Sequence, residues 1–277
     1  MLDLRRAPGG LPLLVAHRGA SGLAPENTMA AFELAAQGDA DIIELDVRLS
    51  ADGHVVVIHD DRLQRTTNGR GAVVSAPLSE LQVLDAGSWF DLRFANETIP
   101  TLAQVLTWAR GQDPPMTLMI ELKGDSQTLA CGLVEKSVQL IAEHEMNEDV
   151  MLISFYHPCL TQAKAVAPDI ATGTIVRLRR FDQLLARVLR LAPILGRVKA
   201  ARQRLLRPLT LSRAVGADSL SIPAIALTSA LVKAAHAAGL AVSPGGRHWD
   251  YPAVIAMGAD TISADDPAAV RATYLTL

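Results

Sequence analysis

A buried β-strand is predicted at Asp41-Ile42-Ile43-Glu44-Leu45-Asp46-Val47. Side chains alternate between the two faces of a strand, so Glu44 and Asp46 share one face with Ile42, and the opposite face is aliphatic. Two carboxylates on the inward face of a buried strand are costly unless a cation or another partner compensates them. This stretch therefore predicts both a sheet and a charged site on that sheet.

Similar short apolar runs recur along the whole chain. The eight candidate strands are Leu13–Ala16, Ile42–Val47, Thr117–Leu122, Val150–Ser154, Thr172–Val176, Ser219–Ile222, Leu240–Ser243 and Thr261–Ser263. Amphipathic stretches such as Thr28–Gln37, Thr128–Glu145 and Ser229–Ala238 separate them, which indicates a parallel sheet covered by helices. Eight such units without a dinucleotide-type glycine loop favour an α/β fold of the (β/α)8 TIM barrel type, as a single domain over residues 1–277.

Two segments depart from a plain barrel. The turn signal Asp52-Gly53 lies between Leu49 and the run His54–His59, so a hairpin is expected after the second strand. The rest of this first insertion, which covers about 52–101, is rich in Gly, Asn, Ser and Thr and is expected to be mostly loop. A second insertion, about 178–210, is basic and helical and lies between the fifth and sixth strands.

The bulk composition narrows the class of protein. With 277 residues, 49% hydrophobic and 20% charged, the chain is expected to be globular with a substantial core. Cys131 and Cys159 offer neither a disulfide framework nor a metal-ligand spacing. The first ten residues lack the apolar run of a signal peptide, and no stretch reaches the length of a membrane helix. A cytoplasmic location is therefore the default expectation.

A metal site is predicted from two of the strands. The run Leu118–Lys123 places Glu121 and Lys123 on one face, at the end of the third barrel strand. Together with Glu44 and Asp46, Glu121 would form an oxygen-rich site for a hard divalent cation such as Mg²⁺ or Ca²⁺. The alternative is a structural network in which Lys123 and Arg18 neutralise the three acids.

Two histidines favour a catalytic interpretation of this cluster. His17 ends the first strand, and His59 ends the return arm of the hairpin. Folding that hairpin about residues 51–53 pairs Leu45 with about His59, which brings this histidine beside Glu44 and Asp46. Two histidines at strand ends beside clustered acids suit general acid–base catalysis near neutral pH.

Ten short motifs occur in the order that is found in glycerophosphodiester phosphodiesterases, and they cover nearly the whole chain. They are His17-Arg18-Gly19, Pro25-Glu26-Asn27-Thr28, Glu44-Leu45-Asp46-Val47, His59-Asp60, Arg65-Thr66-Thr67-Asn68-Gly69, Ile99-Pro100-Thr101-Leu102, Glu121-Leu122-Lys123, Ser154-Phe155, His236-Ala237-Ala238-Gly239-Leu240 and Gly258-Ala259-Asp260. The chain therefore resembles this family of barrel enzymes.

The resemblance implies a reaction and a set of site residues. The reaction is metal-dependent hydrolysis of a glycerophosphodiester to sn-glycerol 3-phosphate and an alcohol. The residues carried over by position are the metal ligands Glu44, Asp46 and Glu121, the acid–base pair His17 and His59, and the phosphate contacts Arg18 and Lys123. A cyclic phosphate formed by the substrate's own hydroxyl and direct attack by water both remain open as routes.

The match fails at two places near the end of the chain. Family members usually carry Trp-Thr-Val-Asn after the seventh strand, where this chain has Ser243-Pro244-Gly245-Gly246 and the nearest tryptophan is Trp249. A Thr-Asp pair expected near the last strand is Ala264-Asp265 here. Because these positions lie outside the predicted catalytic set, we interpret them as a changed substrate pocket that admits an altered or bulkier alcohol.

The charge distribution is uneven. The net charge is −3, but the segment 177–207 holds ten Arg or Lys residues and one acid, Asp182. Phe181, Leu184, Leu185, Val188 and Leu189 share one helical face there. The simpler interpretation is a helix pair packed on the barrel or at a subunit contact. The alternative is a peripheral arm over residues 178–207 that contacts anionic membranes. Nucleic-acid binding is not expected, because the segment is nearly free of aromatic residues.

Three functions are therefore carried forward. The first is hydrolysis of a small-molecule glycerophosphodiester. The second is lysophospholipase D-type hydrolysis of lysophospholipids at a membrane surface, with the basic segment as the docking arm. The third is a non-catalytic barrel that binds phosphodiesters. The pattern leaves the leaving alcohol, the native metal and the oligomeric state open.

Overall fold

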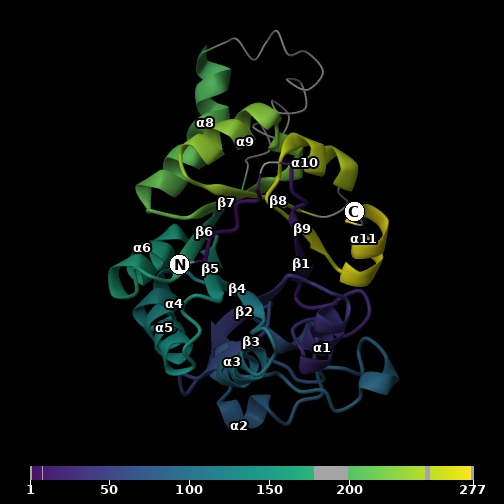
Figure 1. The fold of residues 1–277 in the computed structure, drawn as a ribbon. Coiled ribbons are helices and arrows are strands. Elements are labelled where there is room, and N and C mark those ends of the chain that lie inside the picture. Colours follow the sequence, from purple (N-terminus) through teal and green to yellow (C-terminus); the bar gives the residue numbers. More distant parts are fainter. Residues whose placement is uncertain (1, 8, 178–198, 247–249, 276–277) are drawn as a thin grey trace.

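Eight parallel strands form the wall of a barrel in the computed structural model, which describes residues 2–7, 9–177, 199–246 and 250–275, with backbone alone for 199–206 (Figure 1). The strands are β1 (Leu13–His17), β2 (Ile42–Leu49), β4 (Thr117–Leu122), β5 (Val150–Ser154), β6 (Ala171–Ile175), β7 (Ser219–Pro223), β8 (Ala241–Gly245) and β9 (Thr261–Ala264). Neighbouring strands follow the order β8-β7-β6-β5-β4-β2-β1-β9. All eight predicted strands are confirmed within one or two residues, as is the TIM-barrel class.

Helices surround the strands on the outside of the barrel (Figure 1). They are α1 (Met29–Gln37), α2 (Leu78–Leu81), α3 (Leu102–Arg110), α4 (Ser126–Ala130), α5 (Leu133–Glu143), α6 (His157–Val166), α8 (Lys199–Ala214), α9 (Ser229–Ala237), α10 (Tyr251–Met257) and α11 (Pro267–Tyr274). Threonine side chains cap the N-terminal ends of several of these helices. Thr28 caps α1, and Thr101 forms a capping box with Gln104 at the start of α3.

The alternation of side chains along β2 separates two buried layers. The aliphatic face, which includes Ile43 and Leu45, packs with Phe32 of α1 in the layer between strands and helices. The other face points into the barrel, where Ile42 packs against Leu4 in a smaller cluster. Leu4 precedes β1 and is almost fully buried, so the N-terminal segment fills the N-terminal end of the barrel. The open end of the barrel is therefore the C-terminal end of the strands.

The barrel is closed less tightly between β8 and β9 than elsewhere. The described residues of these two strands form no regular ladder. Directly before β9, the Asp260 amide donates a backbone hydrogen bond to Val242 O of β8 at 2.9 Å. Side chains complete the junction, because the Thr261 hydroxyl donates to Ser243 Oγ at 2.7 Å and the Val242 amide donates to the Asp260 carboxylate at 2.6 Å. We call this junction the β8–β9 seam.

The predicted hairpin follows β2. Its return strand, β3 (Val55–Val57), pairs antiparallel with β2, and Val47 faces Val57 as expected. The ladder ends there, so the expected pairing of Leu45 with His59 was wrong. Instead the Ile58 amide donates to Asp46 O at 2.9 Å, and His59 follows in a bend. The strands separate because the chain must turn outward into the long loop after residue 60.

The long loop after the hairpin has a small apolar core of its own. Short 3-10 helices at Leu63–Arg65, Val73–Ser75 and Leu92–Phe94 punctuate it. Buried side chains on this loop, including Leu63, Leu81 and Ile99, pack against β3. The prediction that this segment is mostly irregular is confirmed, and its core explains how such a long loop is held in place beside the barrel.

The second predicted insertion needs a change of boundary. The apolar face predicted at Phe181–Leu189 lies outside the described residues. The second basic stretch, up to Arg207, is the first part of α8, which runs on to Ala214 and packs on the barrel, because Ser212 contacts Thr174 of β6. It is therefore part of an ordinary barrel helix and not an inserted one. Within the described ranges, none of the helices combines the length and apolar character needed to cross a membrane.

Candidate active site

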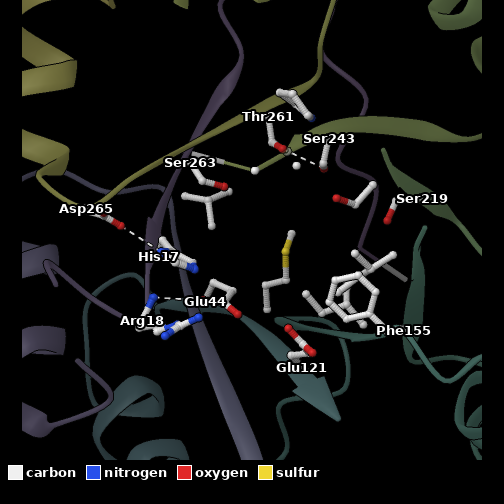
Figure 2. A pocket seen from close by; sticks show the side chains of 18 of the residues that line it. His17, Arg18, Glu44, Glu121, Phe155, Ser219, Ser243, Thr261, Ser263 and Asp265 are labelled. Atoms are coloured by element: carbon white, nitrogen blue, oxygen red, sulfur yellow. Dashed lines mark hydrogen bonds and ion pairs between the residues drawn. The ribbon is translucent and has the colours of Figure 1, made fainter. Parts of the chain in front are cut away.

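A pocket of about 740 Å³ opens at the C-terminal ends of the strands. Figure 2 shows two kinds of wall around it. Charged side chains, among them His17, Arg18, Glu44 and Glu121, lie along β1, β2 and β4. Hydroxyl-bearing and very small residues line the wall formed by the later strands. Six of the seven predicted site residues line this pocket, and the seventh, Asp46, contacts the lining residue Lys123.

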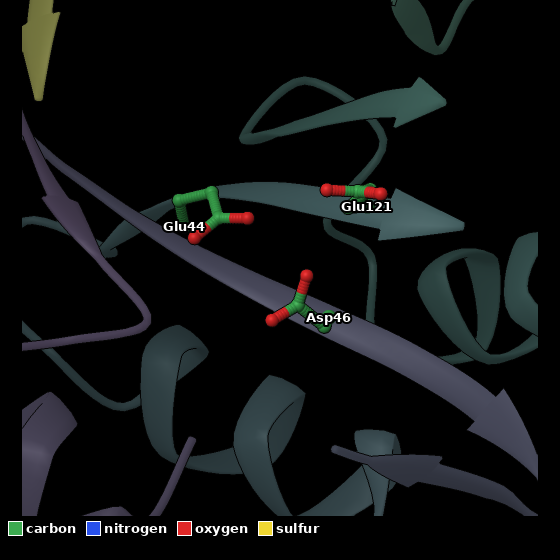
Figure 3. Close-up of side chains that lie close together, drawn as sticks. All are labelled: Glu44, Asp46 and Glu121. Carbon is green, nitrogen blue, oxygen red and sulfur yellow. The ribbon is translucent and has the colours of Figure 1, made fainter. Parts of the chain in front are cut away.

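The three predicted metal ligands lie together. Glu44 and Asp46 come from β2 and Glu121 from β4, where Asp46 and Glu121 are register partners (Figure 3). One oxygen of each carboxylate lies within 4.8 Å of the others. All three residues are buried. Three carboxylate oxygens at this spacing form a donor set suited to one hard divalent cation.

The pKa values of the three acids show the effect of crowding. Burial, followed by the neighbouring charge of Asp46, raises the pKa of Glu44 to about 7. Burial also raises the pKa of Glu121. Burial would raise the pKa of Asp46 as well, but the charges of Lys123 and Arg18 outweigh it and lower that pKa. The three acids are thus buried beside one another, and a cation would offset both their burial and their mutual repulsion.

Lys123 and Arg18 hold the deeper side of the cluster. The Lys123 ammonium lies 2.8 Å from Asp46 Oδ1 and 2.7 Å from Glu121 Oε1. Arg18 Nε lies 3.3 Å from Asp46 Oδ2. The ion pairs of the structural-network interpretation are therefore present. Glu44 is not part of this ion-pair network. Within the described chain it forms no ion pair, and it accepts a hydrogen bond from the Arg18 backbone amide at 2.9 Å.

The turn after β1 explains the His-Arg-Gly motif. Arg18 has a φ of 58°, the left-handed conformation that few non-glycine residues adopt. This conformation directs its amide toward Glu44. Gly19 has a φ of 78°, and a Cβ atom there would lie 2.7 Å from the Ala31 carbonyl, so only glycine fits. The backbone is thus held in an unfavourable conformation where it meets the acid cluster.

Asn27, within the second motif, fixes Asp46 from the other side. Its Nδ2 donates to Asp46 Oδ2 at 2.8 Å, and its Oδ1 accepts from the Asp46 amide at 3.2 Å. The adjacent Glu26 accepts from Arg18 and Arg65, each at 2.7 Å. Hydrogen bonds from the motif at residues 25–28 therefore position Arg18 of the His-Arg-Gly motif and Asp46 of β2.

The two histidines face the pocket, and each has a carboxylate behind it. His17 Nδ1 lies 2.8 Å from Asp265 Oδ1, and His59 Nδ1 lies 2.6 Å from Asp60 Oδ1. Arg65 in turn donates to the Asp60 carboxylate at 2.6 Å. A carboxylate on Nδ1 fixes the ring orientation and leaves Nε2 for proton transfer. The structure therefore brings the predicted pair to one space, as acid–base chemistry requires.

The pKa values of the two histidines move in opposite directions. Burial would lower the pKa of His17, but the hydrogen bond to Asp265 and the charge of Glu44 outweigh it, so this pKa is raised. Burial lowers the pKa of His59 below its ordinary value, and the charge of Asp46 opposes this only in part. The environment of His17 therefore favours the protonated ring more than the environment of His59 does.

Sequence reasoning missed several residues of this site. It placed Asp265 outside the catalytic set, whereas the structure places it against His17. Asp60 was quoted in a motif but given no role, although it follows His59 directly. Phe155 and Arg177 at the pocket wall were not assigned, and the Arg177 guanidinium lies 4.3 Å from the Phe155 ring centre. The adjacency of Asp60 was a usable signal, whereas the contact with Asp265 spans 248 positions.

The site of the missing Trp-Thr-Val-Asn run lies on the pocket. Ser243, Pro244 and Gly245 form the C-terminal end of β8, and Gly246 follows them. All four residues line the pocket. The predicted change of substrate pocket therefore falls on the pocket wall, opposite the acid cluster. Trp249 lies outside the described residues.

Comparison with known sequences identifies relatives over most of the chain. The sequence model of the glycerophosphoryl diester phosphodiesterase family matches residues 17–269. A glycerophosphodiester phosphodiesterase of Caldanaerobacter subterraneus subsp. tengcongensis is 44% identical over 163 residues, which cover 59% of this chain and 66% of that protein. Another of Bacillus subtilis is 34% identical over 186 residues, 62% of each chain. The chain thus spans a little under two thirds of the length of these curated relatives.

Solved structures agree with this result. A phosphodiesterase of Oleispira antarctica, in complex with the product sn-glycerol-3-phosphate, is 31% identical with a TM-score of 0.78. The alignment covers 96% of this chain and 98% of that one. The glycerophosphodiester phosphodiesterase of Agrobacterium tumefaciens is also 31% identical, with a TM-score of 0.72 and coverage of 95% and 100%.

Proposed function

Because this chain belongs to the glycerophosphoryl diester phosphodiesterase family, we propose that it hydrolyses glycerophosphodiesters to sn-glycerol 3-phosphate and an alcohol. The bond that breaks joins phosphorus to the alcohol oxygen. Water supplies a hydroxyl group to phosphorus and a proton to the alcohol. The observation that carries the proposal is the pair His17 and His59 facing one pocket, with the acid cluster, Arg18 and Lys123 beside them.

The opposite pKa directions favour a division of roles between the histidines. His59, whose pKa is lowered by burial, is the better suited of the two to accept the proton of the nucleophile. His17, whose pKa is raised by Asp265 and Glu44, is the better suited to donate a proton to the departing alcohol oxygen. Asp60 and Asp265 would hold the two rings in place during these transfers. The assignment holds for an internal hydroxyl nucleophile as well as for water.

The phosphate is expected to lie over the acid cluster. The residues that would hold a divalent cation, Mg²⁺ or Ca²⁺, are Glu44, Asp46 and Glu121, whose clustered carboxylate oxygens suit such an ion. When bound, the ion would supply electrostatic stabilisation of the phosphoryl oxygens. Arg18 and Lys123 would add positive charge on the same side, and both are fixed by ion pairs before substrate arrives.

Two alternatives carry less support. A binding-only barrel gives no reason for two histidines that are each backed by a carboxylate. Lysophospholipid hydrolysis at a membrane surface depended on the basic segment 178–207, and its predicted apolar face lies outside the described residues. Hydrolysis of small glycerophosphodiesters therefore remains the function that the site supports best.

The test is release of sn-glycerol 3-phosphate from glycerophosphoglycerol and glycerophosphocholine, each with Mg²⁺, Ca²⁺ or EDTA. We expect release with at least one substrate, stopped by EDTA and by His17→Ala. No release from either substrate with any ion would refute the proposal. Release from lysophosphatidylcholine vesicles instead would favour the membrane-acting alternative.

A further inference from the structure

The pocket continues well beyond the residues that would bind phosphate. Small side chains of β7 to β9 line this part of the pocket, namely Ser219, Ser221, Ser243, Gly245 and Ser263. Pockets that enclose small molecules span about 300–1,000 Å³. At about 740 Å³ this pocket has room for a group beside the phosphate. We call the part of the pocket between β6 and β9 the hydroxyl wall, because serine and threonine dominate its polar groups (Figure 2).

The hydroxyls of this wall differ in how far the protein satisfies them. Thr261 donates to Ser243, and Ser219 donates to the Met151 sulfur at 3.3 Å. Ser221 and Ser263 make no side-chain hydrogen bond within the described chain, although both line the pocket. A hydroxyl offers one donor and two acceptor sites. The wall therefore presents both donors and acceptors to whatever occupies this side of the pocket.

The wall is poorly suited to a quaternary ammonium group. Such groups bind over open aromatic faces. Within the described chain, two aromatic rings border the pocket, and both are already in contact with other groups. The Phe155 ring carries the Arg177 guanidinium at 4.3 Å from its centre, and the Tyr251 ring packs on Tyr274 with ring centres 5.1 Å apart. Two carboxylates border the pocket near β9, but Asp265 is bonded to His17, and Asp266 accepts from the Ala269 amide as the cap of α11. A cationic alcohol would meet Arg177 on one side and engaged carboxylates on the other.

We propose that the hydroxyl wall is the subsite for the alcohol leaving group and that it selects uncharged polyhydroxylated alcohols over quaternary-ammonium alcohols. This inference rests on the proposed function, because it assumes that the phosphate lies at the acid cluster. A polyol bonds with Ser221 and Ser263 through its own hydroxyls. Choline, with one hydroxyl lost to the ester, leaves both serines without a partner. Sites that bond substrate hydroxyls reject analogues that lack them.

Gly245 gives access to one of these serines. A Cβ atom at position 245 would lie 3.3 Å from Ser221 Oγ, which is closer than ordinary contact. Glycine therefore leaves the Ser221 hydroxyl uncovered at the end of β8. A larger residue here would narrow the hydroxyl wall on the side away from the histidines. A substitution at this position should therefore change substrate selectivity without contacting the acid cluster.

The experiment compares kcat/KM for glycerophosphoinositol and glycerophosphoglycerol with that for glycerophosphocholine, with the same divalent ion throughout. We expect both polyol diesters to exceed glycerophosphocholine by about 10-fold or more. Equal values, or a preference for glycerophosphocholine, would overturn the inference while leaving the proposed function intact. Hydrolysis of none of the three would instead remove the proposed function and this inference with it.

Variants decide whether the wall causes the preference. Ser221→Ala and Ser263→Ala should each lower the ratio of the polyol to the choline kcat/KM about 5-fold, the value of one hydrogen bond. Gly245→Val should reduce the ratio most for glycerophosphoinositol, the bulkier polyol diester. Ser79→Ala, at an exposed position of α2, is the matched control and should leave the ratio unchanged. Unchanged ratios in all three wall variants would overturn the inference.

Discussion

The two sides of the pocket are built in different ways. The side formed by β1, β2 and β4 is an interlocked set of charges, in which Lys123 and Arg18 both contact Asp46. On the side formed by β6 to β9, strands β7 to β9 contribute mainly small uncharged residues, and hydroxyls such as that of Ser221 make no side-chain hydrogen bond in the described protein. Side chains that are held by ion pairs keep the reacting groups in a fixed geometry. Small neutral side chains determine only the shape and the hydrogen-bonding groups of the space that the substrate enters. We therefore expect substitutions on the first side to change rate, and those on the second to change selectivity.

The largest effect should come from the histidines of the charged side. His17→Ala and His59→Ala should each lower kcat by ~10²–10⁴-fold, because each removes a proton-transfer group. The measurement is steady-state hydrolysis of the best diester substrate at saturating metal. His54→Ala, an exposed histidine at the hairpin turn, is the matched control. A loss below 10-fold in both variants would show that the charged side does not carry the proton transfers.

The next effect concerns the acid cluster. Glu44→Gln and Glu121→Gln should each weaken Mg²⁺ or Ca²⁺ binding by about 10-fold or more, because ligand charge sets the affinity of oxygen sites. Calorimetric titration of the metal-free protein with either ion measures this without a substrate. Glu80→Gln, on the exposed surface of α2, serves as the control. Unchanged affinity in both cluster variants would leave only the structural-network interpretation for these acids.

A smaller effect is expected in stability, at the support of the charged side. Burial would raise the pKa of Glu26, but hydrogen bonds from Arg65 and the charge of Arg18 outweigh it and lower that pKa. Its stabilisation is therefore present above the ordinary pKa of about 4.5 and is lost as the pH falls through the lower folded-state value. Glu26→Gln should cost about 1–3 kcal/mol in the free energy of unfolding at pH 7.

Urea denaturation at several pH values tests this expectation. The difference between wild type and Glu26→Gln should shrink as the pH falls below 4.5, because Glu26 of the wild type becomes protonated. A difference that stays constant down to the acid limit of the folded state would show that the pairs with Arg18 and Arg65 contribute no net charge stabilisation.

The smallest effect belongs to the β8–β9 seam on the hydroxyl side. Thr261→Val keeps the shape of the side chain and removes its bond to Ser243, so it should cost about 1 kcal/mol of stability. Ser243→Ala and the double variant complete a cycle, whose coupling energy in urea denaturation isolates this hydrogen bond. A coupling energy of zero would show that this hydrogen bond does not stabilise the fold.

The regular part of the fold could be predicted from the sequence because periodicity is a local property. The alternation of Glu44 and Asp46 with aliphatic residues located β2 and the inward face of the barrel. The pairing of Val47 with Val57 followed from the turn at Asp52-Gly53. The pairing beyond Val57 could not be predicted from the turn, because it depends on where the following loop leaves β2.

The site could be predicted only in part for a similar reason. The three acids and two histidines occupy strand ends, and the carboxyl ends of parallel strands meet at one face of a barrel. Residues that support them reach the site from elsewhere in the chain. Asp265 contacts His17 across 248 positions, and Asn27 holds Asp46 from a turn whose left-handed conformation no periodicity encodes. The basic helix predicted within residues 178–198 stays a prediction, because these residues lie outside the described structure.

The β8–β9 seam has a mechanical consequence. Seven parallel ladders join the eight strands into one continuous sheet that begins at β8 and ends at β9. Separating these two edges would break the hydrogen bonds of the seam, in which Asp260 bonds to Val242 and Thr261 bonds to Ser243, and would leave every ladder intact. The barrel is therefore one rolled sheet, and the hydrogen bonds that close it lie at the β8–β9 seam, beside Ser243. Amide protons along the seam, such as that of Asp260, should exchange with solvent faster than those inside the ladders of β2 and β4.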